Sequence, residues 1–186
     1  MTDISPSING LNGWPGNGKF FLIGFMGSGK SHWGKIWAAA NQLSFTDLDE
    51  VIEKQEGKSI ATIFEVDGEA HFRKLEAAAL RECANLENTI IACGGGAPCY
   101  LGNMQWMNEH GTTIFIASTL NEIMERVLAE QEKRPLLKKL NPAELIFFVE
   151  QKLRERDPFY TQAKITVQSA ELTEASFLSI LSTTTF

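Results

Sequence analysis

Cysteine and histidine, the residues that build disulfide frameworks and zinc sites, are scarce in this sequence. There are three of each among the 186 residues. The odd number of cysteines and the lack of a C-x-x-C pair argue against a disulfide framework, and the scattered histidines argue against a zinc site. We therefore expect Cys83, Cys93 and Cys99 to be free thiols in a reducing cytoplasm.

Long apolar runs and excess positive charge are also absent. No apolar run approaches the ~20 residues of a membrane span. The N-terminus is polar and carries Asp3 rather than a basic cluster, so we expect no signal peptide. The formal net charge of −6 disfavours broad binding to nucleic acid or to anionic membranes. We expect a cytoplasmic protein that binds neither, and that binds any anion through locally placed arginine and lysine side chains.

The sequence does contain alternating strand and helix patterns, which indicate one domain. Residues 1–17 are rich in Ser, Asn, Gly and Pro, so we expect a flexible tail before a single domain over 18–186. Strands are expected at 19–24, 44–47, 89–93, 113–117 and 164–167. The longer helices are expected up to about 41 and at 69–84, 101–110, 120–129, 142–156 and 173–182. This alternation predicts a three-layer α/β/α fold with a five-stranded parallel sheet.

Residues 24–31 match the phosphate-binding loop G-x-x-x-x-G-K-S. They follow the apolar run 20–23 and precede a predicted helix, which is the context that identifies such a loop. Its backbone N–H groups would surround phosphates, Lys30 would reach the β- and γ-phosphates, and Ser31 would bind Mg²⁺. The alternative is an ordinary glycine turn. A second match at 13–19 precedes a strand rather than following one, so we interpret it as accidental.

Two carboxylates end the second predicted strand. Asp47 and Asp49 are two residues apart, so in an extended segment they point the same way. Near a phosphate loop, this pair suits one Mg²⁺-linked group and one hydroxyl-binding group. The alternative is that Asp49 only caps the next helix and that Asp47 is solvated.

Three successive glycines follow the third predicted strand, where many phosphate-loop proteins have a metal-binding aspartate. Asp47 is therefore the better candidate for the metal. Gly94, Gly95 and Gly96 would let a ligand approach the backbone. The alternative is a tight turn that needs positive φ.

Three arginines are candidate anion ligands. Arg73 lies at the edge of an apolar stripe with Glu76 and Glu69 within helical reach; the alternative is a surface ion pair. Arg156 continues the predicted inward stripe of Ile146, Val149 and Leu153; the alternative is a cation favoured by the helix dipole. Arg134 lies in a charged, proline-containing stretch that suggests a mobile lid at about 130–140, able to bring a cation to the transferring phosphate.

The ordered set of these segments resembles the shikimate kinase family over about residues 19–182. Besides the phosphate loop, the matching segments are 45–49 with 52–53, 59–64, 68–70 with 72–76, 94–97, 134–137 and 156–160. The phosphate loop alone is generic, whereas the ordered set is specific. The resemblance implies strand order 2-3-1-4-5, as in nucleoside monophosphate kinases. It also implies transfer of phosphate from ATP to the 3-hydroxyl of shikimate, in aromatic amino-acid biosynthesis.

The resemblance also implies roles for the matching residues. ATP would be bound by Gly27, Ser28, Gly29, Lys30, Ser31, His32 and Arg134, and Mg²⁺ by Ser31 and Asp47. Shikimate would be bound by Asp49, Arg73, Gly94, Gly95, Gly96 and Arg156. Catalysis would depend on Lys30, Asp49 and Arg134. We expect a monomer that binds shikimate, ATP and Mg²⁺ and binds neither nucleic acid nor a membrane.

One position departs from the family pattern, because His32 stands where Thr or Ser is usual. A hydroxyl contact to the α-phosphate would then be lost or replaced by imidazole. Two alternative functions stay open. One is another small-molecule kinase of this fold, acting on gluconate or a nucleotide. The other is a non-catalytic sensor of shikimate-like ligands, against which Lys30, Ser31, Asp47 and Asp49 together argue.

Overall fold

The computed structural model describes residues 18–129, 137 and 140–182 of the chain. Within these residues, five parallel strands form one sheet of order β2-β3-β1-β4-β5. The strands are β1 (Lys19–Ile23), β2 (Ser44–Asp47), β3 (Thr89–Ala92), β4 (Thr112–Ala117) and β5 (Ile165–Gln168). The predicted fold class and strand order are confirmed. The predicted tail at 1–17 lies outside the described residues.

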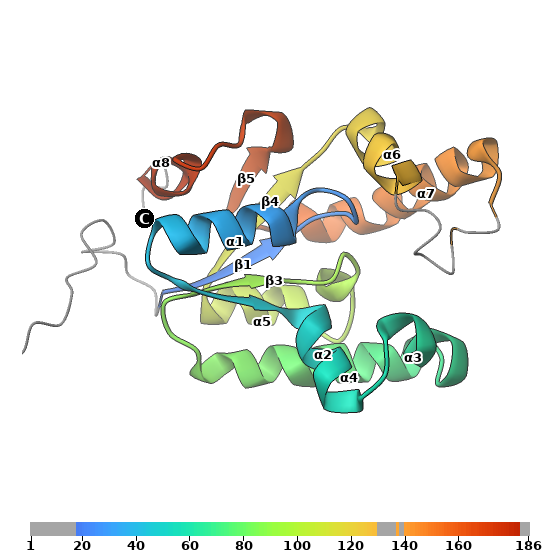
Figure 1. The fold of residues 1–186 in the computed structure, drawn as a ribbon, viewed down its shortest axis with the longest axis horizontal. Coiled ribbons are helices and arrows are strands. Elements are labelled where there is room, and N and C mark those ends of the chain that lie inside the picture. The colour runs from blue at the N-terminus through green and yellow to red at the C-terminus, as the bar shows by residue number, and fades with distance from the viewer. Residues whose placement is uncertain (1–17, 130–136, 138–139, 183–186) are drawn as a thin grey trace, which may run out of the picture.

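Helices cover both faces of the sheet (Figure 1). They are α1 (Lys30–Ala40), α2 (Leu48–Glu56), α3 (Ile60–Val66), α4 (Glu69–Glu82), α5 (Asn103–His110), α6 (Leu120–Ala129), α7 (Pro142–Tyr160) and α8 (Ser176–Ser182), with short 3₁₀ turns η1 (Cys83–Asn85), η2 (Ala97–Cys99) and η4 (Ser169–Glu171). None of the helices in the described part of the chain is long and apolar enough to cross a membrane.

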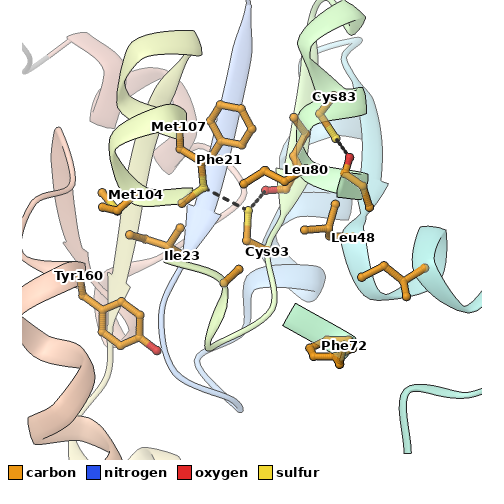
Figure 2. Close-up of a cluster of buried hydrophobic side chains, with 14 of the residues drawn as sticks. Phe21, Ile23, Leu48, Phe72, Leu80, Cys83, Cys93, Met104, Met107 and Tyr160 are labelled. Atoms are coloured by element: carbon orange, nitrogen blue, oxygen red, sulfur yellow. Dashed lines mark hydrogen bonds between the residues drawn. The ribbon is translucent and has the colours of Figure 1, made fainter. Parts of the chain in front are cut away.

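The central strand β1 divides the core into two clusters, because its side chains point alternately to opposite faces. Phe20 and Leu22 pack with Trp37 of α1 and with α8. Phe21 and Ile23 pack on the other face with α4 and α5. Figure 2 shows this second cluster, in which Cys93 lies against the sulfur of Met107 of α5, and Tyr160 reaches in from the end of α7. All five residues of β1 are buried, as expected for the centre of a parallel sheet.

The strand register brings three sequence segments to one edge of the sheet. Asp47, the last residue of β2, pairs with Ala92, the last residue of β3, and Ala92 pairs with Leu22 near the end of β1. The phosphate loop, the segment of Asp47 and Asp49, and the three glycines therefore lie side by side at the carboxyl edge of the sheet. Phe25 of the phosphate loop also packs in a third cluster with α6 and α7, which anchors the loop on its other side.

Helix α7 differs from its prediction in length and in register. It runs to Tyr160 rather than ending at about 156, with Pro158 inside its last turns. A proline there removes one backbone donor. The last turn of the helix is still closed by a hydrogen bond, because the Thr161 N–H donates to the Asp157 carbonyl at 3.0 Å. The predicted inward position at Ile146 is wrong: that side chain is 42% exposed and Leu145 is buried instead. The helix begins at a capping box formed by Asn141 and Glu144, with Pro142 in its first turn.

Candidate active site

The phosphate loop connects β1 to α1, and its glycines adopt conformations that other residues avoid. Gly24 has φ 144° and Gly29 has φ 93°. A Cβ at Gly24 would also lie 2.7 Å from the Ile116 carbonyl oxygen. Gly29, the N-cap of α1, offers no side-chain hydrogen bond to the first turn. The N–H groups at the start of α1 are thus available to an anion, which the helix dipole favours at this end.

Lys30 is folded back onto this loop. Its Nζ donates to the Gly24 carbonyl at 2.9 Å and to the Phe25 carbonyl at 2.8 Å. Burial lowers the pKa of the amine to about 8, opposed by the negative charge of Asp49. A phosphate bound in the loop would give the buried ammonium an anionic partner, which would reverse the effect of burial.

Ser31 and Asp47 form an oxygen pair beside the loop. The Ser31 hydroxyl donates to Asp47 Oδ2 at 2.6 Å. The other oxygen, Asp47 Oδ1, accepts from the Asp49 N–H at 3.1 Å and caps α2. The helix cap is therefore Asp47, and the alternative in which Asp49 serves only as the cap is wrong.

Asp49 carries a buried acceptor that no helix-capping role uses. Its Oδ1 is buried without a hydrogen-bond partner in the part of the chain that the structure describes. Burial raises the pKa of this carboxyl group to about 6, and the nearby charge of Asp47 adds to the shift. Such an unsatisfied buried acceptor is costly unless a ligand hydrogen-bonds to it. Asp49 therefore has the position and the raised proton affinity expected of a carboxylate that accepts a hydrogen bond or a proton from a ligand.

The three glycines after β3 each lie against a different polar group. A Cβ at Gly94 would lie 2.5 Å from Glu76 Oε1 and 3.2 Å from Asp49 Oδ1. A Cβ at Gly95 would approach Arg156, and a Cβ at Gly96 would approach Arg73. None of the three has positive φ, so the alternative of a turn that needs positive φ is wrong. The segment does turn, since the Ala97 N–H donates to the Gly94 carbonyl at 2.9 Å, and the glycines allow the polar groups to approach it closely. The glycine loop, residues 94–96, is thus the surface around which the polar groups converge.

Arg73 is buried between two carboxylates on its own helix. Its Nη1 donates to Glu76 Oε2 at 2.7 Å, while Nε and Nη2 donate to Glu69 Oε1 at 3.2 and 2.9 Å. Arg73 is 7% exposed and Glu76 is fully buried, so the surface ion pair considered above is wrong. Burial raises the pKa of Glu76 to about 7, against the opposing charge of Arg73. A Cβ at Gly96 would lie 2.5 Å from Arg73 Nη2.

Arg156 approaches the same loop from α7. Its Nη1 would lie 3.3 Å from a Cβ at Gly95, and its Cζ lies 5.2 Å from the ring centre of Phe25. One helical turn later, the Tyr160 hydroxyl donates to the Gly95 carbonyl. Two guanidinium groups from distant segments therefore meet at neighbouring glycines. Like charges brought this close favour an anion between them.

Comparisons with known proteins show the family of this chain. The model of the shikimate kinase family matches residues 26–185. The chain belongs to the shikimate kinase family. These enzymes use ATP to phosphorylate a hydroxyl of shikimate, in aromatic amino-acid biosynthesis, and the predicted recognition and activity are confirmed.

Individual relatives support the assignment over most of the chain. The shikimate kinase of Parabacteroides distasonis is 40% identical over 154 residues, which are 83% of this chain and 89% of that protein. The crystal structure of shikimate kinase from Bacteroides thetaiotaomicron is 38% identical with a TM-score of 0.80, covering 88% of this chain and 94% of that one. The Acinetobacter baumannii enzyme, solved in complex with shikimate, is 28% identical with a TM-score of 0.78, covering 87% and 88%.

The binding and catalytic roles of the predicted site residues all stay predictions. Arg134 and most of the predicted lid lie outside the described residues. His32 is exposed at the start of α1, with its ring centre 5.1 Å from that of Trp33, and its contact to a nucleotide stays a prediction. In the described residues, no cluster of three or more His, Cys, Asp or Glu side chains could hold a metal ion.

Two residues that contact the predicted site were not identified from the sequence. Tyr160 fixes the glycine loop, and its i+4 spacing from Arg156 was an available signal, since such residues share a helix face. Tyr100 stacks on Arg73, with its ring centre 4.3 Å from Arg73 Cζ. No local pattern indicated this contact, because 27 positions separate the two residues and only the fold brings them together.

Replacing Gly96 with alanine tests the convergence on the glycine loop. The added Cβ would lie within 2.8 Å of Arg73 Nη1, Nη2 and Cζ, and the paired, buried guanidinium could move only by breaking its ion pairs. We expect the shikimate KM to rise roughly tenfold or more, because small misplacements of a binding group are costly. The KM for ATP should stay near the parent value. Steady-state kinetics check this, and an unchanged shikimate KM would show that Arg73 is not held against the loop.

Proposed function

We propose that this kinase transfers the γ-phosphoryl group of ATP to the 3-hydroxyl of shikimate, giving shikimate 3-phosphate. The supporting observation is the arrangement around the glycine loop. The carboxylate of Asp49 lies at one end of it, and the guanidinium groups of Arg156 and Arg73 lie at the other. An acceptor with hydroxyls at one end and a carboxylate at the other would match both. The Met26 N–H of the phosphate loop borders the same segment, 3.2 Å from a Cβ at Gly95.

Asp49 would accept the proton of the attacking hydroxyl. The hydroxyl oxygen forms a bond to the γ-phosphorus, the bond from that phosphorus to the β,γ-bridging oxygen breaks, and ADP leaves. The proton passes to Asp49 Oδ1, the buried acceptor. With a pKa raised to about 6, this carboxylate is largely ionised near neutral pH and is a better base than an ordinary aspartate.

The phosphate loop would bind ATP through the backbone of residues 27–31, with Lys30 on the β- and γ-phosphates and His32 near the α-phosphate. Support comes from the free N–H groups at the start of α1 and from the buried amine of Lys30 beside them. Arg134 would bring a further cation to the ATP phosphates from a lid at about 130–140. That role rests on the family resemblance and on the charged stretch in the sequence.

Ser31 and Asp47 would hold Mg²⁺ together with the ATP phosphates. The two oxygens lie 2.6 Å apart at the start of α1. A hydroxyl and a carboxylate are ligands that Mg²⁺ prefers, and this ion usually keeps water and phosphate in the rest of its shell. When bound, it would neutralise charge that develops on the phosphates.

We also propose that the enzyme acts as a monomer in the cytoplasm. The described groups assigned to shikimate, on Asp49, Arg73 and Arg156, converge on one glycine loop of the same chain. Cys83, Cys93 and Cys99 are free thiols, as suits a reducing compartment.

An acceptor panel tests the function. ADP release is followed with Mg²⁺ and ATP in the presence of shikimate, gluconate or a nucleoside monophosphate. We expect steady turnover with shikimate and rates near the ATP-only background with the other two. Faster turnover with gluconate or a nucleotide would replace the proposed acceptor. Binding of shikimate without any turnover would favour a sensor.

A further inference from the structure

Tyr100 lies where the glycine loop continues into α5, directly against Arg73. Its ring centre is 4.3 Å from Arg73 Cζ, and its hydroxyl donates to Glu69 Oε1 at 3.2 Å. Phe72 and Phe64 also lie near this guanidinium, at 5.1 and 5.8 Å. Tyr100 is the nearest of the three rings and carries the only hydroxyl among them. It therefore contacts both Arg73 and the carboxylate that orients Arg73.

The hydrogen bonds of Arg73 leave part of the guanidinium for a ligand. Of its five N–H groups, two donate to Glu69 and one donates to Glu76. Within the described residues, one N–H on each terminal nitrogen has no protein partner. The terminal nitrogens face Gly96, where a Cβ would lie 2.5 Å from Nη2 and 2.7 Å from Nη1. Rotation of Arg73 would turn these donors away from the loop.

The backbone around Tyr100 is held in a strained turn. Leu101, the next residue, has φ 50°, a left-handed conformation that is uncommon outside glycine. The Asn103 N–H closes the turn on the Tyr100 carbonyl at 2.9 Å. Such strain persists only where surrounding contacts impose it.

Those contacts come from the helix that carries Arg73. Arg81, two turns further along α4, donates to the Leu101 carbonyl at 3.2 Å and to Asn103 Oδ1 at 2.9 Å. Asn103, which is fully buried, donates in turn to the Ala97 carbonyl at 2.9 Å. Helix α4 thus binds the segment 97–103 at two places, with Arg73 against the Tyr100 ring and Arg81 beyond it.

We infer that Tyr100 is a positioning residue for the substrate carboxylate. Its ring lies against Arg73. Its hydroxyl donates to Glu69 and so keeps that carboxylate against Nε and Nη2 of Arg73. Together they keep the remaining donors of Arg73 facing the glycine loop. This inference rests on the proposed binding of the shikimate carboxylate by Arg73. If the ring only covered apolar surface, its replacement would affect shikimate and its uncharged methyl ester equally.

Replacing Tyr100 tests this role through the separation of KM from kcat. For Tyr100→Leu we expect the shikimate KM to rise about 3- to 10-fold, as for the loss of a cation–π contact. We expect kcat to stay within about twofold and the KM for ATP to stay unchanged, because Arg73 acts in shikimate binding. Tyr100→Phe keeps the ring and should raise the shikimate KM only about twofold. In a Glu69→Ala background, Tyr100→Phe should have no further effect, since the hydroxyl acts through Glu69.

The methyl ester of shikimate separates positioning from packing. The ester lacks the charge that Arg73 binds, so Tyr100→Leu should change its KM little. Phe147→Leu, at an exposed aromatic residue of α7, is the control and should match the parent with both substrates. Calorimetric titration with shikimate alone gives the same comparison without turnover, and thermal unfolding shows whether each variant folds.

Two results would overturn the inference. One is a parent-like shikimate KM and binding constant for a folded Tyr100→Leu enzyme. The other is an equal loss with acid and ester, which would make Tyr100 a packing residue. A parent enzyme that neither binds nor phosphorylates shikimate would instead overturn the proposed function, so the two failures are distinguishable.

Discussion

Replacing Asp49 with asparagine is expected to lower kcat by about 10²-fold or more while ATP binding persists. The amide keeps the shape of the side chain but has no negative charge and is not a base. The buried Oδ1 has no other protein partner within the described residues, so its acceptor capacity is available to the substrate hydroxyl. The cap of α2 belongs to Asp47, and the helix start should therefore survive the change.

A neighbouring carboxylate provides the control for this variant. Glu50 follows Asp49 on α2, and its side chain is exposed and paired with Lys35 at 3.3 Å. Glu50→Gln should keep kcat near the parent value, because exposed ion pairs contribute little. Steady-state kinetics with saturating shikimate measure both variants, and calorimetry measures nucleotide binding. Near-normal turnover of Asp49→Asn would remove Asp49 from proton transfer.

Replacing either site arginine with leucine is expected to raise the shikimate KM by roughly 10- to 150-fold, with little change in ATP binding. Each charged hydrogen bond to the carboxylate should contribute about 1.5–3 kcal/mol, which gives this range. Lysine should rescue only in part at Arg73 and Arg156, because it supplies the charge without the paired donors of a guanidinium.

Arg156 gives the cleaner experiment of the two. Arg73→Leu would leave the fully buried Glu76 without its cation, so some loss of folding stability is expected besides the change in KM. Arg154→Leu is a matched control on the same helix, since that side chain is 79% exposed. Thermal unfolding separates stability from binding. Equal shikimate KM values for Arg156→Leu and Arg154→Leu would contradict the assignment of Arg156.

The sequence was sufficient to predict the phosphate loop and the parallel sheet, because both depend on local patterns. The strands were predictable from short apolar runs, and the loop from its glycines, Lys30 and Ser31. The strand order came from the family resemblance alone, since no local pattern sets which strands are neighbours.

Features that depend on register or burial were not predictable in the same way. On α7, the buried stripe could include either Ile146 or Leu145, and the packing of the third cluster selects Leu145. Arg73 has carboxylates at helical spacing whether the pair is buried or exposed, so spacing could not decide between the two. Tyr100 reaches Glu69 across 31 positions of sequence, a contact that only the completed fold produces.

The most direct test of the central claim compares shikimate with its methyl ester as acceptors for the parent enzyme. ADP formation is measured with saturating ATP and Mg²⁺, and kcat/KM is compared. If Arg73 and Arg156 bind the carboxylate, the ester should be a poor substrate, by about 10-fold or more, and should lose little further activity in Arg156→Leu. An ester phosphorylated as efficiently as the acid would contradict the account, because the two arginines would then bind no carboxylate.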